Sequence, residues 1–164
     1  MKTLHISVLA VALTVALTST AAAGPSAVGQ RVAITMKNLP EGTFMLTPLG
    51  SRTLAPDSGK ISHGVLNDNA REVIRGGQKV SIYPPVVWTL KGRFGTLTIR
   101  EPRNMWVDAG SDLGGPFIGT GTWTVVRGTG LYAGRSGGGR SAHAGLNGGT
   151  SPWFARQEGI LSRR

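Results

Sequence analysis

The stretch GTGTWTVVRGTGLYAGRSGGGR, residues 119–140, decides the fold of this chain. Its glycines separate runs of β-branched and aromatic residues, and fourteen of the forty residues from Gly110 to Gly149 are glycine. A phosphate-binding loop would need a Lys-Ser/Thr pair followed by a helix, and the sequence pattern offers neither. The glycine spacing also misses the dinucleotide-binding fingerprint. Glycines at this density suit tight corners and bulges instead, so the stretch predicts sharply curved β-structure.

The rest of the chain carries short strand-like runs separated by Gly, Pro, Asn and Asp, which is the all-β pattern. The predicted strands are residues 30–36, 43–47, 60–66, 86–90, 94–99, 105–107 paired with 117–118, 120–127, 140–146 and 153–161. The cluster 56–59 predicts a turn, and Pro84-Pro85 predicts a break in a ladder because neither residue donates an N–H. With about eight strands, the sequence predicts an all-β fold, a single eight-stranded antiparallel β-barrel.

One stretch is ambiguous between helix and strand. Residues 65–75 fit a short helix that Gly76 would end, whereas 71–75 and 78–83 fit two strands joined through Gly76-Gly77. The glycine pair accepts the positive φ angles of a tight hairpin, which favours the second alternative.

The first 23 residues have the three-part layout of a secretory signal peptide. Lys2 supplies positive charge, a mostly apolar run of about a dozen residues follows, and Ala21-Ala22-Ala23 offers a small-residue cleavage site. The run is shorter than the roughly 18–20 residues of a bilayer span. The sequence therefore predicts residues 1–23 as signal peptide, 24–164 as one β-barrel domain, a secreted or periplasmic location, and no integral membrane segment.

Composition narrows the function classes. The 164 residues include no cysteine, which excludes disulfides, zinc-thiolate sites and thiol nucleophiles. His63 and His143 have no third ligand at a recognised spacing, so no metal site is predicted. The net charge of +10 is dispersed along the chain and would attract anionic envelope polymers, but no nucleic-acid reader motif accompanies it.

Residues 123–140 resemble the strand–GTG–aromatic–Gly segment of the allene oxide cyclase and dirigent barrel superfamily, and in particular its small secreted bacterial members of unassigned function. Residues 92–101 are similar to the preceding hairpin strand of that family, and 158–161 to its closing strand. The resemblance implies an eight-stranded barrel with an apolar cavity, chemistry without a cofactor, and homo-oligomers. The acidic and aromatic pocket residues of the plant members have no secure counterpart in this chain.

Glu101 is the candidate catalytic residue. It shares strand phase with Leu97 and Ile99, so an unbroken strand would point its carboxylate into an apolar interior, where burial raises a carboxyl pKa. The alternative, which the sequence favours, is that Pro102 ends the strand and leaves Glu101 at the rim beside an arginine.

Aromatic residues on or beside predicted strands form the candidate ligand-binding set. They either fill the barrel, as most such residues do, or line a cavity for a flat apolar ligand. The set comprises Trp88, Phe94, Trp106, Trp123, Tyr132 and Trp153.

Three functions follow from these observations. The first is a secreted barrel that binds a small apolar or aromatic ligand in its lumen without a cofactor. The second is a cofactor-independent cyclase, isomerase or dirigent-type coupling guide, whose cavity would restrict the conformers of a reactive substrate. The third is a basic envelope-associated protein that binds polyanions.

Overall fold

The computed structural model describes residues 29–39, 41–50, 54–64, 71–108, 116–145 and 153–163. The predicted signal peptide lies outside these residues. Within them the chain forms strands and one short 3-10 helix, η1. The elements are β1 (Gln30–Leu39), β2 (Thr43–Leu49), β3 (Asp57–Gly64), β4 (Arg71–Arg75), β5 (Gln78–Tyr83), β6 (Val86–Gly92), β7 (Gly95–Glu101), β8 (Asn104–Asp108), β9 (Phe117–Gly128), η1 (Gly130–Tyr132), β10 (Arg135–Gly145) and β11 (Trp153–Arg163).

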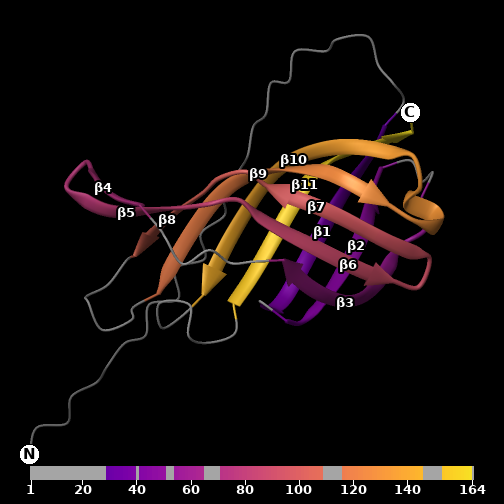
Figure 1. The fold of residues 1–164 in the computed structure, drawn as a ribbon, viewed down its shortest axis with the longest axis horizontal. Coiled ribbons are helices and arrows are strands. Elements are labelled where there is room, and N and C mark those ends of the chain that lie inside the picture. The colour runs from indigo at the N-terminus through magenta and orange to yellow at the C-terminus, as the bar shows by residue number, and fades with distance from the viewer. Residues whose placement is uncertain are drawn as a thin grey trace, which may run out of the picture.

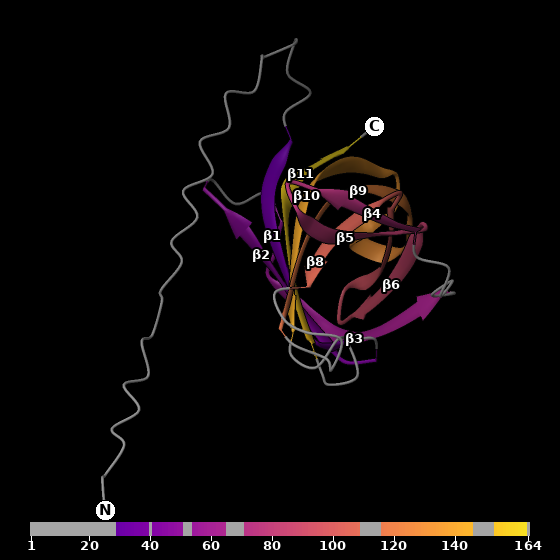
Figure 2. The ribbon, with the colours of Figure 1, turned by 90° about the vertical axis from the view of Figure 1, so that its left-hand side faces the viewer.

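Eight strands close into a barrel. They follow the order β10-β11-β1-β2-β3-β6-β7-β9, and pairing of β9 with β10 joins the two ends of the series. Every pairing is antiparallel. Figure 2 shows these strands arranged around a common axis. The predicted all-β, eight-stranded antiparallel β-barrel is confirmed.

The remaining strands β8, β5 and β4 extend the barrel wall at one end. β5 pairs with β8 in the same register in which β6 pairs with β7. The consecutive strands β5 and β6 therefore behave as one long strand with a break, and so do β7 and β8. The breaks fall at Pro84-Pro85 and next to Pro102, where a missing N–H interrupts the ladder. Figure 1 shows the β4–β5 hairpin projecting past the end of the barrel.

Two local predictions have opposite outcomes. The hairpin of 71–75 and 78–83 is confirmed, with φ of 57° at Gly76 and 78° at Gly77, and the helical alternative is wrong over 71–75. The turn predicted at 56–59 is also wrong, because β3 already begins at Asp57, which pairs with Leu46. The Asp57 side chain does not close a local turn and instead accepts a hydrogen bond from the distant Tyr132.

The core follows from strand alternation. Inward-facing apolar side chains of seven barrel strands, all except β10, pack into one buried cluster, which includes Ile34, Leu46, Leu90 and Ile99. Within the described residues, no helix is long and apolar enough to cross a membrane.

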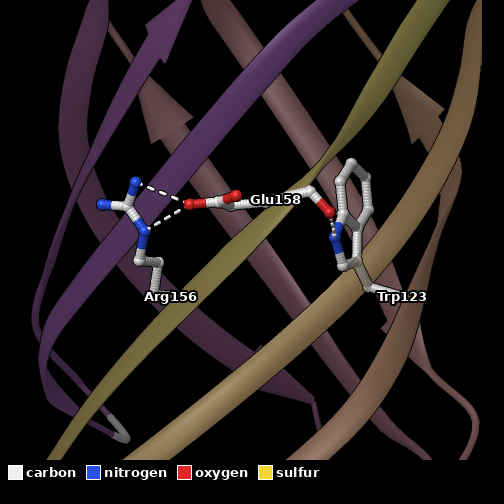
Figure 3. Close-up of polar contacts among 3 residues, drawn as sticks. All are labelled: Trp123, Arg156 and Glu158. Carbon is white, nitrogen blue, oxygen red and sulfur yellow. Dashed lines mark hydrogen bonds and ion pairs between the residues drawn. The ribbon is translucent and has the colours of Figure 1, made fainter. Parts of the chain in front are cut away.

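Glycines allow the backbones of β9, β10 and β11 to approach one another closely. Trp123, Gly139 and Gly159 lie opposite one another in a single row across the three strands. A Cβ atom at Gly139 would collide with the carbonyl oxygen of Glu158, so this approach requires glycine. Trp123 extends its indole across the row, and its Nε1 donates to the Glu158 carbonyl oxygen at 3.4 Å (Figure 3). The glycines therefore create the space that the indole fills.

Candidate functional site

Glu101 is the last residue of β7 and points into the barrel. Val86 is its cross-strand partner, so pairing extends through position 101. The alternation that buries Leu97 and Ile99 therefore reaches Glu101, whose exposure is 0%. The favoured prediction of a rim position is wrong: the ladder breaks at Pro102, one residue after the Glu101–Val86 pair, and Glu101 stays inside the barrel.

Two neighbouring side chains hold this carboxylate. Gln157 on β11 donates its Nε2–H to Glu101 Oε1 at 2.6 Å. His143 on β10 places Nε2 3.2 Å from Oε2, a distance at which a protonated imidazole forms an ion pair. All three side chains are buried. An uncompensated charge in an apolar interior costs several kcal/mol. The contacts from Gln157 and His143 offset this cost, so the Glu101 side chain can be buried. We call Glu101, His143 and Gln157 the carboxylate cluster.

Two indoles form the apolar side of the cluster. Trp88 on β6 and Trp153 on β11 meet edge to face, with ring centroids 5.8 Å apart. The His143 ring lies 5.4 Å from the Trp153 ring at a tilt of 49°. Polar and aromatic groups therefore adjoin at one place in the barrel, which is the composition typical of small-molecule sites.

One buried polar atom of the cluster, and one beside it, lack partners among the described residues. Ser141 on β10 lies directly opposite Gln157 on β11. Within the described part of the chain, neither Ser141 Oγ nor Gln157 Oε1 has a hydrogen-bond partner. An unpaired buried polar atom costs about 1–3 kcal/mol. A molecule that accepts from the serine hydroxyl and donates to the glutamine oxygen would recover this energy.

The opposite end of the barrel is closed by a different buried acid. Tyr132, in η1, donates its hydroxyl to Asp57 Oδ2 at 2.8 Å. Asp57 also accepts from the backbone N–H groups of Ser58 and Arg93, each at 2.8 Å. Burial and the bond to Asp57 raise the pKa of Tyr132 well above its usual range. Figure 1 shows η1 as the orange coil at the end away from the β4–β5 hairpin. Glu101 belongs to the hairpin end, because it is the last residue of β7 and is followed by β8, which pairs with β5.

The structure places the sequence-predicted residues at several locations. Trp88 and Trp153 lie on the apolar side of the carboxylate cluster, and Tyr132 lies at the other end of the barrel. Trp123 is buried against the glycine row. Phe94 lies in the β6–β7 turn at 38% exposure, with the Arg93 guanidinium 5.2 Å from its ring centre. Trp106 lies on β8, and its side chain is outside the described part of the structure.

Sequence reasoning missed Ser141, His143 and Gln157 as site residues. A usable signal exists, because Gln157 shares strand phase with Trp153 and Leu161, and Ser141 shares phase with His143. His143 has no partner at a metal-ligand spacing in the sequence. Among the described residues, no group of three or more His, Asp or Glu side chains is placed to hold an ion.

The fold and the site together define a class: a closed antiparallel β-barrel with a carboxylate cluster buried beside two indoles at one end. Comparisons with protein-family models, curated proteins and solved structures found no match to this chain. The function is therefore argued from the site alone.

Proposed function

We propose that this barrel binds a small apolar or aromatic molecule bearing a hydrogen-bonding group, and that the carboxylate cluster is where it binds. The observation that carries the proposal is the pair of unpaired buried atoms, Ser141 Oγ and Gln157 Oε1. The carboxylate cluster links them to the indoles, since the His143 ring contacts Trp153. A ligand hydroxyl would satisfy both atoms while its apolar part packs on the indoles.

Ligand entry requires a side chain to move, because the interior at this site is filled. Trp88 and Glu101 have no exposed surface, and Trp153 is almost fully covered. We assign the movement to Trp153, which is the first residue of β11. Its pairing with Leu39 lies beyond an irregularity in the β1–β11 register that begins after Met36. A side chain at an irregular strand end can turn at less cost than one inside the ladder.

The test compares two probes of the same shape, 2-naphthol and naphthalene, by isothermal titration calorimetry. We expect 2-naphthol to bind at least tenfold more tightly, since naphthalene leaves both polar atoms unpaired. The Ser141→Ala variant should lose most of this preference. Ser136→Ala, on the same strand near the opposite end, is the matched control and should keep it. Equal affinity of the wild-type protein for the two probes would contradict the proposal.

Two broader expectations stay proposals. The closed eight-stranded barrel supports kinship with the allene oxide cyclase and dirigent superfamily, and the signal-like residues 1–23 support secretion. Homo-oligomers remain an implication of that kinship.

A second candidate function, adhesion to polyanions, is favoured by a row of lysines on the outer face. Lys60 and Lys91 lie directly opposite each other, and Lys37 lies in the same row beyond Thr43. All three lysines are exposed, and no carboxylate of a described residue forms an ion pair with any of them. Like charges directly opposite each other destabilise a sheet, and an anionic polymer would offset that cost.

Binding to dextran sulfate tests the lysine row. We expect the affinity to fall steeply as salt rises, since binding releases counterions. Replacing Lys37, Lys60 and Lys91 together by Gln should weaken binding at least tenfold. The charge-matched control, Arg71, Arg103 and Arg140 replaced by Gln, should weaken it less than threefold, and equal losses would exclude a role for this row.

A further inference from the structure

The amide of Gln157 links two functional positions. Its Nε2 donates to the Glu101 carboxylate, and its Oε1 is the unpaired acceptor. A ligand hydroxyl that donates to Oε1 therefore lies next to the carboxylate. Ser141, opposite Gln157, offers a hydroxyl donor at the adjacent position. The protein thus presents an acceptor and a donor side by side, with a carboxylate beside them.

An α-hydroxyketone has the complementary groups in the same order. Its hydroxyl donates, its neighbouring carbonyl accepts, and the C–H bond between them is acidic. The molecule must be uncharged, because an anion would meet the Glu101 carboxylate in a buried site where like charges repel strongly. An aryl substituent suits the edge-to-face pair of Trp88 and Trp153.

We infer that Glu101 moves a proton between the two carbons of an uncharged aryl α-hydroxyketone, so that the barrel is an isomerase of such compounds. This inference rests on the proposed function, because it needs the same ligand position. It adds a substrate class and a chemical step to that position.

The step balances without a co-reactant. The Glu101 carboxylate takes the proton from the hydroxyl-bearing carbon, and the C–H electron pair forms the C=C bond of an enediolate. The carbonyl π pair moves onto its oxygen, which accepts a hydrogen bond from Ser141. The hydroxyl proton passes between the two ligand oxygens, and Glu101 returns its own proton to the second carbon. Carbonyl and hydroxyl exchange places, and nothing is oxidised or reduced.

His143 and Gln157 are positioning residues in this step. Each approaches a different oxygen of Glu101, so together they fix the carboxylate plane. The carboxylate held in this orientation is the group that would take up the proton. General-base catalysis by a positioned group typically contributes about 100- to 10,000-fold.

The experiment uses the full chain and the probe 1-hydroxy-1-phenylpropan-2-one, whose product 2-hydroxy-1-phenylpropan-1-one is a conjugated aryl ketone measurable by absorbance and chromatography. We expect turnover by the wild-type protein, and a loss of at least 100-fold for Glu101→Gln with probe affinity kept within threefold. Glu158→Gln is the control, because that carboxylate pairs with Arg156 on the outer face and should leave turnover unchanged. Glu101→Asp, which keeps the charge and shortens the side chain, should lose at least tenfold and replaces Glu101→Gln if that variant does not fold.

Three results separate the two proposals. Probe binding without isomerisation, or equal turnover by wild-type protein and the Glu101 variants, overturns proton transfer and leaves binding intact. Failure to bind the hydroxyketone while 2-naphthol still binds overturns this substrate class alone. Failure of both probes to bind overturns the proposed function and this inference together.

Discussion

Two buried acids mark the two ends of the barrel, and their surroundings assign them different roles. Asp57 accepts from the Tyr132 hydroxyl and from three backbone N–H groups, those of Ser58, Arg93 and Phe94. One side chain thereby joins η1, the start of β3 and the β6–β7 turn. Glu101 instead lies beside two unpaired polar atoms. Asp57 therefore holds parts of the fold together, whereas Glu101 is the acid for which we propose a chemical role.

The Tyr132–Asp57 bond has a measurable stability contribution. Tyr132→Phe removes one donor from a buried carboxylate, and hydrogen bonds to charged groups contribute about 1.5–3 kcal/mol. We expect the free energy of unfolding to fall by about that amount at pH 7. Chemical denaturation followed by tryptophan fluorescence measures it.

The same bond predicts a pH dependence whose sign is fixed. The pKa of Tyr132 is raised in the folded protein, whereas the unfolded chain ionises near the ordinary value of about 10. The contribution is therefore complete below pH 10 and is lost as pH rises above it. The difference in free energy of unfolding between the wild-type protein and Tyr132→Phe should narrow from pH 9 to pH 11. Titration of the lysines changes the stability of both proteins alike, so it does not affect this difference. A difference that stays constant or widens would show that Tyr132 is not protonated in this bond.

At the scale of single elements, local chemistry predicted what depends on neighbours in sequence. Gly76-Gly77 fixed the β4–β5 hairpin because positive φ angles are accessible to glycine. Pro84-Pro85 fixed the break between β5 and β6 because proline donates no hydrogen bond. Both features follow from a residue's own backbone, so a single sequence suffices to predict them.

Features that depend on distant partners were mispredicted. Pro102 suggested that the strand before it ends early, but pairing with Val86 holds Glu101 in the ladder. Asp57 suggested a turn, but Tyr132, 75 residues away, takes up its side chain. In both cases a long-range contact outweighs a local preference, and a single sequence does not reveal which strands will be neighbours.

In the carboxylate cluster, too, some features follow from local sequence and others from distant partners. Strand alternation places Glu101, His143 and Gln157 on inner faces, and this phase is visible in the sequence. Their meeting depends on strand order, because β7, β10 and β11 are brought together only by closure of the barrel. Sequence therefore predicts which side chains point inward, and topology decides which of them meet.

At the scale of the whole molecule, closure depends on the pairing of β9 with β10. The two strands are joined through η1, which folds over one end and brings Tyr132 to Asp57. β9 is long enough to pair with β7 in its second half and with β8 in its first half. β9 thus both completes the barrel and pairs with β8, which carries the projecting β4–β5 hairpin. A destabilising substitution in β9 should therefore lower the stability of the entire molecule.

Trp123 is where this dependence can be tested. Its indole fills the space above the glycine row at the β9–β10 seam and bonds to the Glu158 carbonyl (Figure 3). Trp123→Ala should lower the free energy of unfolding by about 3–5 kcal/mol, since it leaves a cavity that rigid paired strands cannot collapse to fill. Phe154→Ala on β11 is the control: that ring is 49% exposed on the outer face, and its loss should cost less than about 0.5 kcal/mol. Denaturation midpoints followed by far-ultraviolet circular dichroism compare the two variants, and similar midpoints would mean that the seam does not govern closure.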